Sequence, residues 1–180
     1  MTKFSAIAAI SILFLSCADT VSVNNPSADN TTKTAAAKSD NVITFKVNGT
    51  AVVTSGWTIS RLQWSTDPGK LWLNITSNMH DDKRTIGANL NGAVPGTYIL
   101  GLENGALSKQ SYGSYHPDYA ETLNGYSFIN GSFVITEMDT VRNIVNGTFS
   151  GTVKNSKGES LSITDGKIIN GKLNPHINTY

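Results

Sequence analysis

Hydrophobic and polar side chains alternate along several short segments of this chain. The clearest case is residues 42–47, where every second residue from Ile43 to Val47 is large and apolar. Asn48 and Gly49 follow directly, and Asn-Gly is a favoured two-residue hairpin turn. We therefore predict a strand at residues 42–47 that leads into the first hairpin of the domain.

The same alternation recurs further along the chain. It gives one apolar face in each of residues 71–76, 86–90, 133–135, 145–153 and 161–163. Turn sequences rich in Gly, Pro, Asn and Asp separate them, at residues 67–69, 91–92 and 155–158, and Asp165-Gly166 predicts either another turn or a bulge. Short strands about eight to twelve residues apart are typical of all-β domains. We predict an antiparallel β-sandwich or a partly closed β-barrel, with almost no helix.

Two details of these strands concern aromatic packing. Gly147 and Gly151 fall on the apolar face that includes Phe149, so we expect them to leave room for a large neighbour, such as a tryptophan. In the segment 71–76, Trp72 falls opposite the apolar face. We therefore expect Trp72 on the exposed side of its strand.

The chain begins with the features of a secretory signal. Lys3 gives a basic start, Ala6 to Leu15 is a run that is apolar except for Ser11, and the small residue Ser16 stands directly before Cys17. Such a run spans only about 15 Å as a helix, half of a bilayer core. We therefore predict a cleaved signal peptide over residues 1–16.

The sequence Phe14-Leu15-Ser16-Cys17 resembles the cleavage box of bacterial lipoproteins. That resemblance implies that Cys17 becomes the first residue and carries acyl chains such as palmitate, which anchor the protein to a membrane. The alternative is an ordinary signal peptide that is cut nearby and leaves a chance thiol. Since Cys17 is the sole cysteine of the chain, an internal disulfide is excluded.

The polar segment after the cysteine predicts a tether. Residues 18–40 are rich in Ser, Thr, Asn, Ala and Lys and contain no aromatic side chain, so they cannot bury enough surface to order themselves. We predict a lipidated N-terminus and disordered tether at residues 17–40, a β-domain at 41–174 and a C-terminal tail at 175–180.

The charge of the chain argues against one class of partner. Fourteen basic side chains stand against thirteen acidic ones, and only 15% of the residues are charged. Binding of nucleic acid depends largely on neutralising phosphates with clustered Lys and Arg. We therefore expect no nucleic-acid partner.

Four strand and turn segments stand out along the chain: FKVNGT from Phe45, GTYILG from Gly96, ITEMD from Ile135 and VNGTFSG from Val145. Together they resemble an uncharacterised family of cell-envelope lipoproteins in Bacteroidota. These segments share turns and strands but no acid, base or nucleophile. The resemblance therefore implies an all-β lipoprotein and carries no catalytic residues across.

Aromatic residues supply the main candidate for a binding site. Tyr112, Tyr115 and Tyr119 lie in residues 102–124, which we predict to be one long loop, and Trp72 is expected to join them. Aromatic faces on loops of a β-domain can stack against sugars or a protein partner. Further candidates for the same surface are Tyr126, Trp57 and Trp64. The alternative is that these rings cover the sheet and keep their hydroxyls in water.

Candidates for catalysis or metal binding are sparse. His80-Asp81-Asp82 combines an imidazole with two carboxylates but lacks the alternate-residue spacing of a calcium loop. Ser114, His116 and Asp118 are too close along the chain to form a triad across the fold, and His176 falls in the expected tail. We predict no cofactor, no metal and no catalytic residue.

Two short segments, Asp19-Thr20-Val21 and Asp139-Thr140-Val141, look like the O-glycosylation motif of Bacteroidota. Thr20 and Thr140 are therefore candidate glycan acceptors, and Thr140 falls in an expected loop. An intact-mass measurement after native expression tests both sites.

Together these patterns predict a non-enzymatic, lipid-anchored binding or structural module of the cell envelope, at the outer membrane. The first alternative is a carbohydrate-binding accessory lipoprotein of a glycan-uptake system. The second is an envelope hydrolase using His80 or His116, and a third is a scaffold or inhibitor that grips an envelope protein through a sheet edge or loop.

Overall fold

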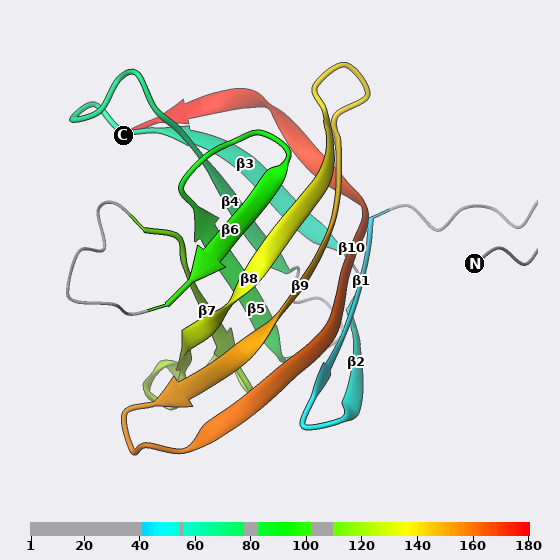
Figure 1. The fold of residues 1–180 in the computed structure, drawn as a ribbon, viewed down its shortest axis with the longest axis vertical. Helices are drawn as coiled ribbons and strands as arrows, with labels where there is room; N and C mark the ends of the chain where they lie inside the picture. The colour runs from blue at the N-terminus through cyan, green and yellow to red at the C-terminus, as the bar shows by residue number, and fades with distance from the viewer. Residues whose placement is uncertain (1–40, 55, 78–82, 102–109) are drawn as a thin grey trace, which may run out of the picture. The chain divides into compact units, whose positions relative to one another are not determined.

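The computed structural model describes residues 41–54, 56–77, 83–101 and 110–180 (Figure 1). These residues form β-strands and one short 3-10 helix, η1 (Thr122–Asn124). The strands are β1 (Val42–Val47), β2 (Thr50–Thr54), β3 (Trp57–Gln63), β4 (Leu71–Ser77), β5 (Thr85–Leu90), β6 (Gly96–Leu100), β7 (Tyr112–His116), β8 (Tyr126–Asp139), β9 (Ile144–Asn155) and β10 (Ser160–Thr179). The predicted all-β class is confirmed. Among the described residues, no helix has the length and hydropathy needed to cross a membrane.

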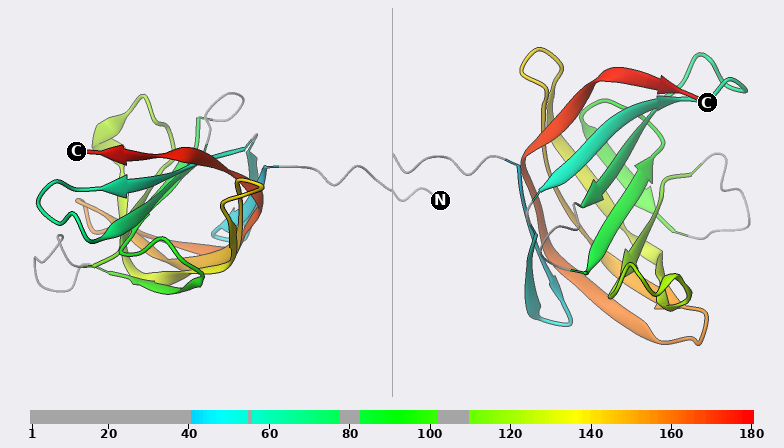
Figure 2. Two further views of the ribbon diagram at one scale, coloured as in Figure 1. Left: turned by 90° about the horizontal axis from the view of Figure 1, so that it is seen from above. Right: turned by 180° about the vertical axis from the view of Figure 1, so that it is seen from behind.

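All ten strands belong to a single sheet that curls back on itself. Their order is β2-β1-β10-β3-β4-β5-β7-β8-β6, and β9 pairs with both β8 and β10. The strands from β10 through β3, β4, β5, β7, β8 and β9 therefore form a ring around the interior (Figure 2). The shortest strand pairing in the ring is between β7 and β8, which share only the pairs Ser114–Ser127 and Tyr115–Tyr126. Of the two predicted forms, the domain has the partly closed barrel.

The last strand, β10, has two sets of neighbours. Its first part runs antiparallel to β9 on one edge and to β1 on the other. Its final part runs parallel to β3, from the pair Lys172–Thr58 to the pair Thr179–Gln63. The expected tail at 175–180 is therefore wrong, since β10 extends to Thr179. Pro175 falls within the irregularity of this ladder, where its missing N–H is tolerated.

The predicted first hairpin is present between β1 and β2. Asn48 and Gly49 both have positive φ, at 47° and 82°, which is the requirement of the favoured two-residue turn. The Asn48 backbone N–H donates to the Ser162 carbonyl at 2.9 Å, and the Ser162 N–H donates to the Asn48 Oδ1 at 2.8 Å. These two bonds attach the turn to β10.

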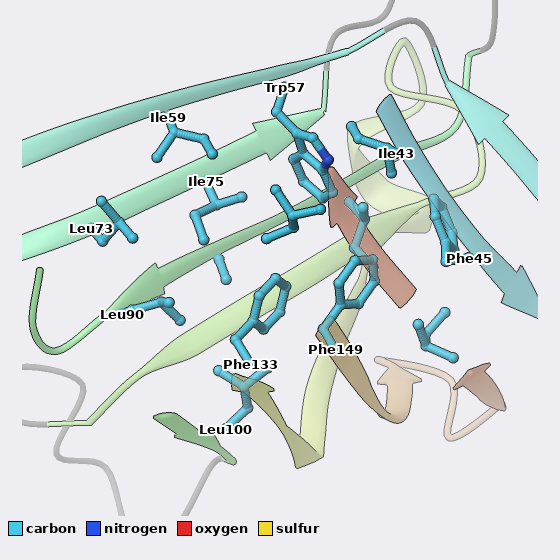
Figure 3. Close-up of a cluster of buried hydrophobic side chains, with 14 of the residues drawn as sticks. Ile43, Phe45, Trp57, Ile59, Leu73, Ile75, Leu90, Leu100, Phe133 and Phe149 are labelled. Atoms are coloured by element: carbon cyan, nitrogen blue, oxygen red, sulfur yellow. The ribbon is translucent and has the colours of Figure 1, made fainter. Parts of the chain in front are cut away.

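The interior is filled by apolar side chains from every strand (Figure 3). Phe149 of β9 lies at its centre and stacks on Phe133 of β8, with ring centroids 4.7 Å apart. Trp57 and Phe45 also contact Phe149, at centroid distances of 5.8 and 5.9 Å. Aromatic pairs of this kind stabilise a core beyond the area that they bury.

The two glycines of β9 leave room for β8. A Cβ atom on Gly151 would clash with the Asn130 carbonyl oxygen, and one on Gly147 would lie 2.5 Å from that of Val134, so both glycines allow the backbone of β8 to approach closely. A Cβ atom on Gly151 would also lie 2.9 Å from the nearest ring carbon of Phe128. The expected large neighbour is therefore present at Gly151, as a phenylalanine of β8 and not a tryptophan.

Candidate functional site

The four aromatic residues expected to form one binding surface have different environments. Tyr115 is only 3% exposed and packs edge-on against Phe45, with centroids 6.2 Å apart. It also contacts Tyr126 at 6.3 Å. The side chain of Tyr115 points from β7 into the barrel, since side chains alternate between the inside and the outside along a barrel strand. Tyr115 therefore belongs to the core and has no accessible face for a ligand.

The expected exposure of Trp72 is also wrong. Trp72 does lie on the outer side of β4, opposite Leu73 and Ile75, but its exposed fraction is 5%. It pairs across the strands with Leu62, which is also buried. The Lys70 Nζ lies 5.1 Å from the centre of its ring. The alternation predicted the correct face of β4 for Trp72. The ring is nevertheless buried, because Leu62 across the strands and Lys70 cover it on that face.

Tyr112 and Tyr119 are the accessible members of the predicted set. Tyr112 is half-buried on the outer side of β7. Tyr119 follows β7 and is 45% exposed, and its backbone N–H donates to the Lys83 carbonyl at 3.0 Å. The segment 102–124 is therefore not one long loop, since β7 and η1 occupy its second half; residues 102–109 lie outside the described ranges.

The candidate catalytic residues near β7 are held in structural contacts. The His116 ring packs against Gly125, where a Cβ atom would lie 2.6 Å from the His116 Cε1. The Asp118 carboxylate accepts the Ala120 backbone N–H at 2.9 Å and pairs with Lys83 at 3.1 Å. These two contacts, the first being the stronger, hold the pKa of Asp118 below its usual value. The segment His80-Asp81-Asp82 lies outside the described residues.

His176 is an exposed residue of β10, and its backbone N–H donates to the Asn174 Oδ1 at 3.0 Å. In the described ranges, no three His, Cys, Asp or Glu side chains come together as a metal-binding group.

A groove of about 570 Å³ runs beside β6 and was not predicted from the sequence. Its lining comes from β6 and the residue after it (97–101), from β8 (129–131), and from Asn91, Gln110 and Ser111. The side chains combine amides, hydroxyls and two exposed isoleucines, Ile99 and Ile129. Such a surface offers hydrogen bonds and apolar contact to a ligand without net charge.

Hydrogen bonds fix the walls of this groove. The Asn91 backbone N–H donates to the Ser111 Oγ at 2.9 Å, which joins the end of β5 to the start of β7. On the β8 side, the Asn130 Oδ1 accepts the Thr152 backbone N–H at 3.1 Å. The side-chain amide of Asn130 is therefore oriented by β9, and the groove is formed in advance of any ligand.

The turn before β6 is locked by Tyr98. Its hydroxyl donates to the Val94 carbonyl at 2.6 Å and accepts the Val94 N–H at 3.2 Å. Gly92 lies against the Tyr98 ring, where a Cβ atom would be 2.9 Å from the nearest ring carbon. The sequence contained one signal for this arrangement, an uncharged strand directly after Pro95, but no local pattern indicates a groove there.

Trp64 and Tyr180 form a second exposed feature. Their ring centroids are 5.4 Å apart, and the residues are 38% and 61% exposed. The Ser65 N–H donates to the Tyr180 carbonyl at 2.6 Å, and the Tyr180 N–H donates to the Gln63 carbonyl at 3.0 Å. The backbone thus fixes both rings side by side.

Of the candidate modification sites, only Thr140 lies in the described residues. It is exposed in the turn between β8 and β9. The Asp139 Oδ1 accepts the backbone N–H groups of Val141 and Arg142, both at 2.8 Å, and the Arg142 Nε lies 2.6 Å from the Asp139 Oδ2. These bonds lower the pKa of Asp139, the Arg142 backbone N–H contributing most. Thr20 and the lipidation candidate Cys17 lie outside the described ranges.

Comparison of the chain with protein-family models, with curated proteins and with solved structures finds no match. The resemblance to Bacteroidota envelope lipoproteins therefore stays a prediction from the sequence.

Proposed function

We propose that this protein is a non-enzymatic binding module that a lipid on Cys17 holds at the cell envelope, and that its ligand occupies the groove beside β6. The observation that supports this function most is the composition of the groove. It is lined by three side-chain amides, Asn91, Gln110 and Asn130, together with the exposed Ile99. Amides both donate and accept hydrogen bonds, so they complement the polar groups of an uncharged ligand.

Site-specific crosslinking in native cells tests the binding site. The photoreactive residue p-benzoylphenylalanine replaces Ile99, which is 70% exposed on the groove wall. The control places the same residue at Leu123, which is almost fully exposed on η1 and does not line the groove. We expect a discrete adduct from position 99 alone. No adduct at position 99, or an equal yield at both positions, contradicts binding in the groove.

The lipid anchor has a separate test. An apolar run ends at Leu15, and the small residue Ser16 stands directly before the sole cysteine; this order supports acylation of Cys17. We expect metabolic labelling with palmitate to mark the native protein and the Cys17→Ser variant to lose the label. The variant should also leave the membrane fraction, because anchoring by two or three acyl chains is effectively permanent. A soluble native protein with a bare thiol contradicts the anchor.

Carbohydrate binding is the second candidate function, and the Trp64–Tyr180 pair favours it. Two neighbouring exposed rings offer faces on which a pyranose can stack, with affinity gained at low entropic cost. We expect neutral gluco-, xylo- or manno-oligosaccharides to change the tryptophan fluorescence and Trp64→Ala to abolish the change. Trp57 is buried in the core and supplies a constant background. No response from the three oligosaccharide series contradicts this candidate.

A further inference from the structure

The outer edge of β6 is an incomplete strand ladder. Along one edge, all five residues of β6 pair with β8, from Gly96–Ile135 to Leu100–Gly131. On the other edge, the described residues contribute a single parallel bridge, between Leu100 and Ser111. That bridge demonstrates that the backbone at the end of β6 already has the geometry of strand pairing.

The groove follows this open edge. Tyr98 points toward the interior, where it packs against the core, and Ile99 points outward, yet both line the groove. A space that borders both faces of a strand lies along its edge, because successive side chains point to opposite faces. Alternate backbone N–H and C=O groups of an edge strand face outward and lack sheet partners.

The other edge strand, β2, differs in its surroundings. Like β6, β2 itself has no charged residue. The hollow near β2 is nevertheless lined by charged side chains of the neighbouring strands, Lys46 of β1 and Asp165 of β10, whose Nζ and Oδ2 atoms lie 2.8 Å apart. Charged side chains beside a sheet edge are a common protection against pairing with another chain. No charged residue lines the groove of β6 among the described residues.

We propose that the groove binds an extended, uncharged peptide segment of another protein, which adds to β6 as a further strand. This inference rests on the proposed binding function of the groove. An open strand edge is complementary to the backbone of an extended chain, which supplies both donors and acceptors at the strand repeat. About four residues, or roughly 14 Å, would pair with the part of β6 that precedes the Leu100–Ser111 bridge, and every second side chain would lie next to Thr97 or Ile99 on the outer face.

Selection from a random peptide library tests this proposal. The full chain, purified in detergent, is panned against displayed peptides of roughly twelve residues, long enough to cover the edge with flanks. We expect enriched peptides in which apolar residues recur at every second position and charged residues are absent from the alternating stretch. One enriched peptide is then synthesised, and its dissociation constant is measured by calorimetry.

Three changes separate strand addition from other modes of binding. Ile99→Lys should weaken the peptide at least about tenfold, because it places a charge on the strand edge. The matched control Leu123→Lys, on exposed η1, should leave affinity unchanged. N-methylation of alternate peptide amides should also weaken binding at least about tenfold in one register and have little effect in the other, because only one set faces β6. Backbone amides of β6 should exchange hydrogen more slowly when the peptide is bound.

The outcomes that overturn the proposal are distinct from failure of the proposed function. One such outcome is a peptide whose affinity is lowered by Ile99→Lys but by N-methylation in neither register. In that case the groove binds a ligand, but not by strand addition. The same holds if no peptide is enriched while a neutral oligosaccharide binds with sensitivity to Ile99→Lys. If the protein forms a dimer that the Ile99→Lys variant does not form, the occupant of the groove is a second copy of the chain. That result overturns the proposal of a peptide from another protein. If neither peptides nor oligosaccharides respond to Ile99→Lys, the binding function of the groove falls as well.

Discussion

β6 and β9 flank the same strand, β8, and both run antiparallel to it, yet they have opposite environments. Ser132 of β8 lies between Ile99 of β6 and Ser150 of β9 in the same row of the sheet. β9 is paired on both edges, by β8 and β10, whereas the described residues pair with one edge of β6 only through the Leu100–Ser111 bridge, beside a groove. The difference indicates that β9 contributes more to the stability of the fold and that β6 has the more accessible backbone.

The comparison predicts its largest effect at Phe149, the aromatic centre of β9. Phe149→Ala removes a ring that contacts Phe133, Trp57 and Phe45, and should lower the free energy of unfolding by about 3–5 kcal/mol. Ile99→Ala on β6 should change it by less than about 0.5 kcal/mol, because that side chain is mostly in water. Urea unfolding followed by circular dichroism measures both, and equal losses would contradict the comparison.

Gly151→Ala should have the next largest effect. Its Cβ atom would meet the carbonyl oxygen of Asn130, so β8 and β9 would have to separate locally, at a cost of about 1–3 kcal/mol. The matched control is Gly69→Ala in the β3–β4 turn, where a Cβ atom has no neighbour within 4 Å. Thermal unfolding of both variants tests the prediction, which fails if Gly151→Ala has the melting temperature of the native protein.

A smaller effect concerns pH at the turn between β8 and β9. The pKa of Asp139 is lowered in the folded protein, so its carboxylate stabilises the fold above the carboxyl's ordinary pKa. This contribution is lost as the pH falls through the lowered value. We expect Asp139→Asn to be less stable than the native protein at pH 6 and the difference to shrink toward pH 2, as measured by urea unfolding. A constant difference across this range would rule out the carboxylate as its source.

The smallest expected effect on stability is at Thr140. Thr140→Ala alters an exposed side chain of the same turn and should leave the unfolding free energy within about 0.5 kcal/mol of the native value. In the native host, we predict that the variant loses the mass of an O-linked glycan. The prediction fails if the intact mass of the natively expressed protein corresponds to an unmodified Thr140.

Local patterns predicted those strands in which alternation and turn chemistry agree. Ile43 and Phe45 are buried and the Asn48-Gly49 turn has the expected positive φ angles. Gly158 likewise has a positive φ, and Asp165-Gly166 forms one of the two predicted structures, a bulge in β10. These features depend on residues close together in the chain, so the sequence contains most of their determinants.

The errors concern contacts between different strands. The burial of Trp72 depends on Leu62 in the neighbouring strand β3, and the parallel pairing of residues 172–179 with β3 joins segments more than a hundred residues apart. The groove likewise forms where the end of β6 meets the start of β7 beside β8. The hydrophobic periodicity within one segment does not determine which strands contact one another. The sequence therefore predicted the fold class but not the groove.

The double pairing of β10 has a consequence for how the protein matures. The parallel ladder between residues 172–179 and β3 is the join that closes the ring of strands. Synthesis must therefore deliver the residues up to 179 before the ring can close. Until then, one edge of β1 and one edge of β3 lack their native neighbour β10, and unpaired strand edges of this kind promote aggregation during folding.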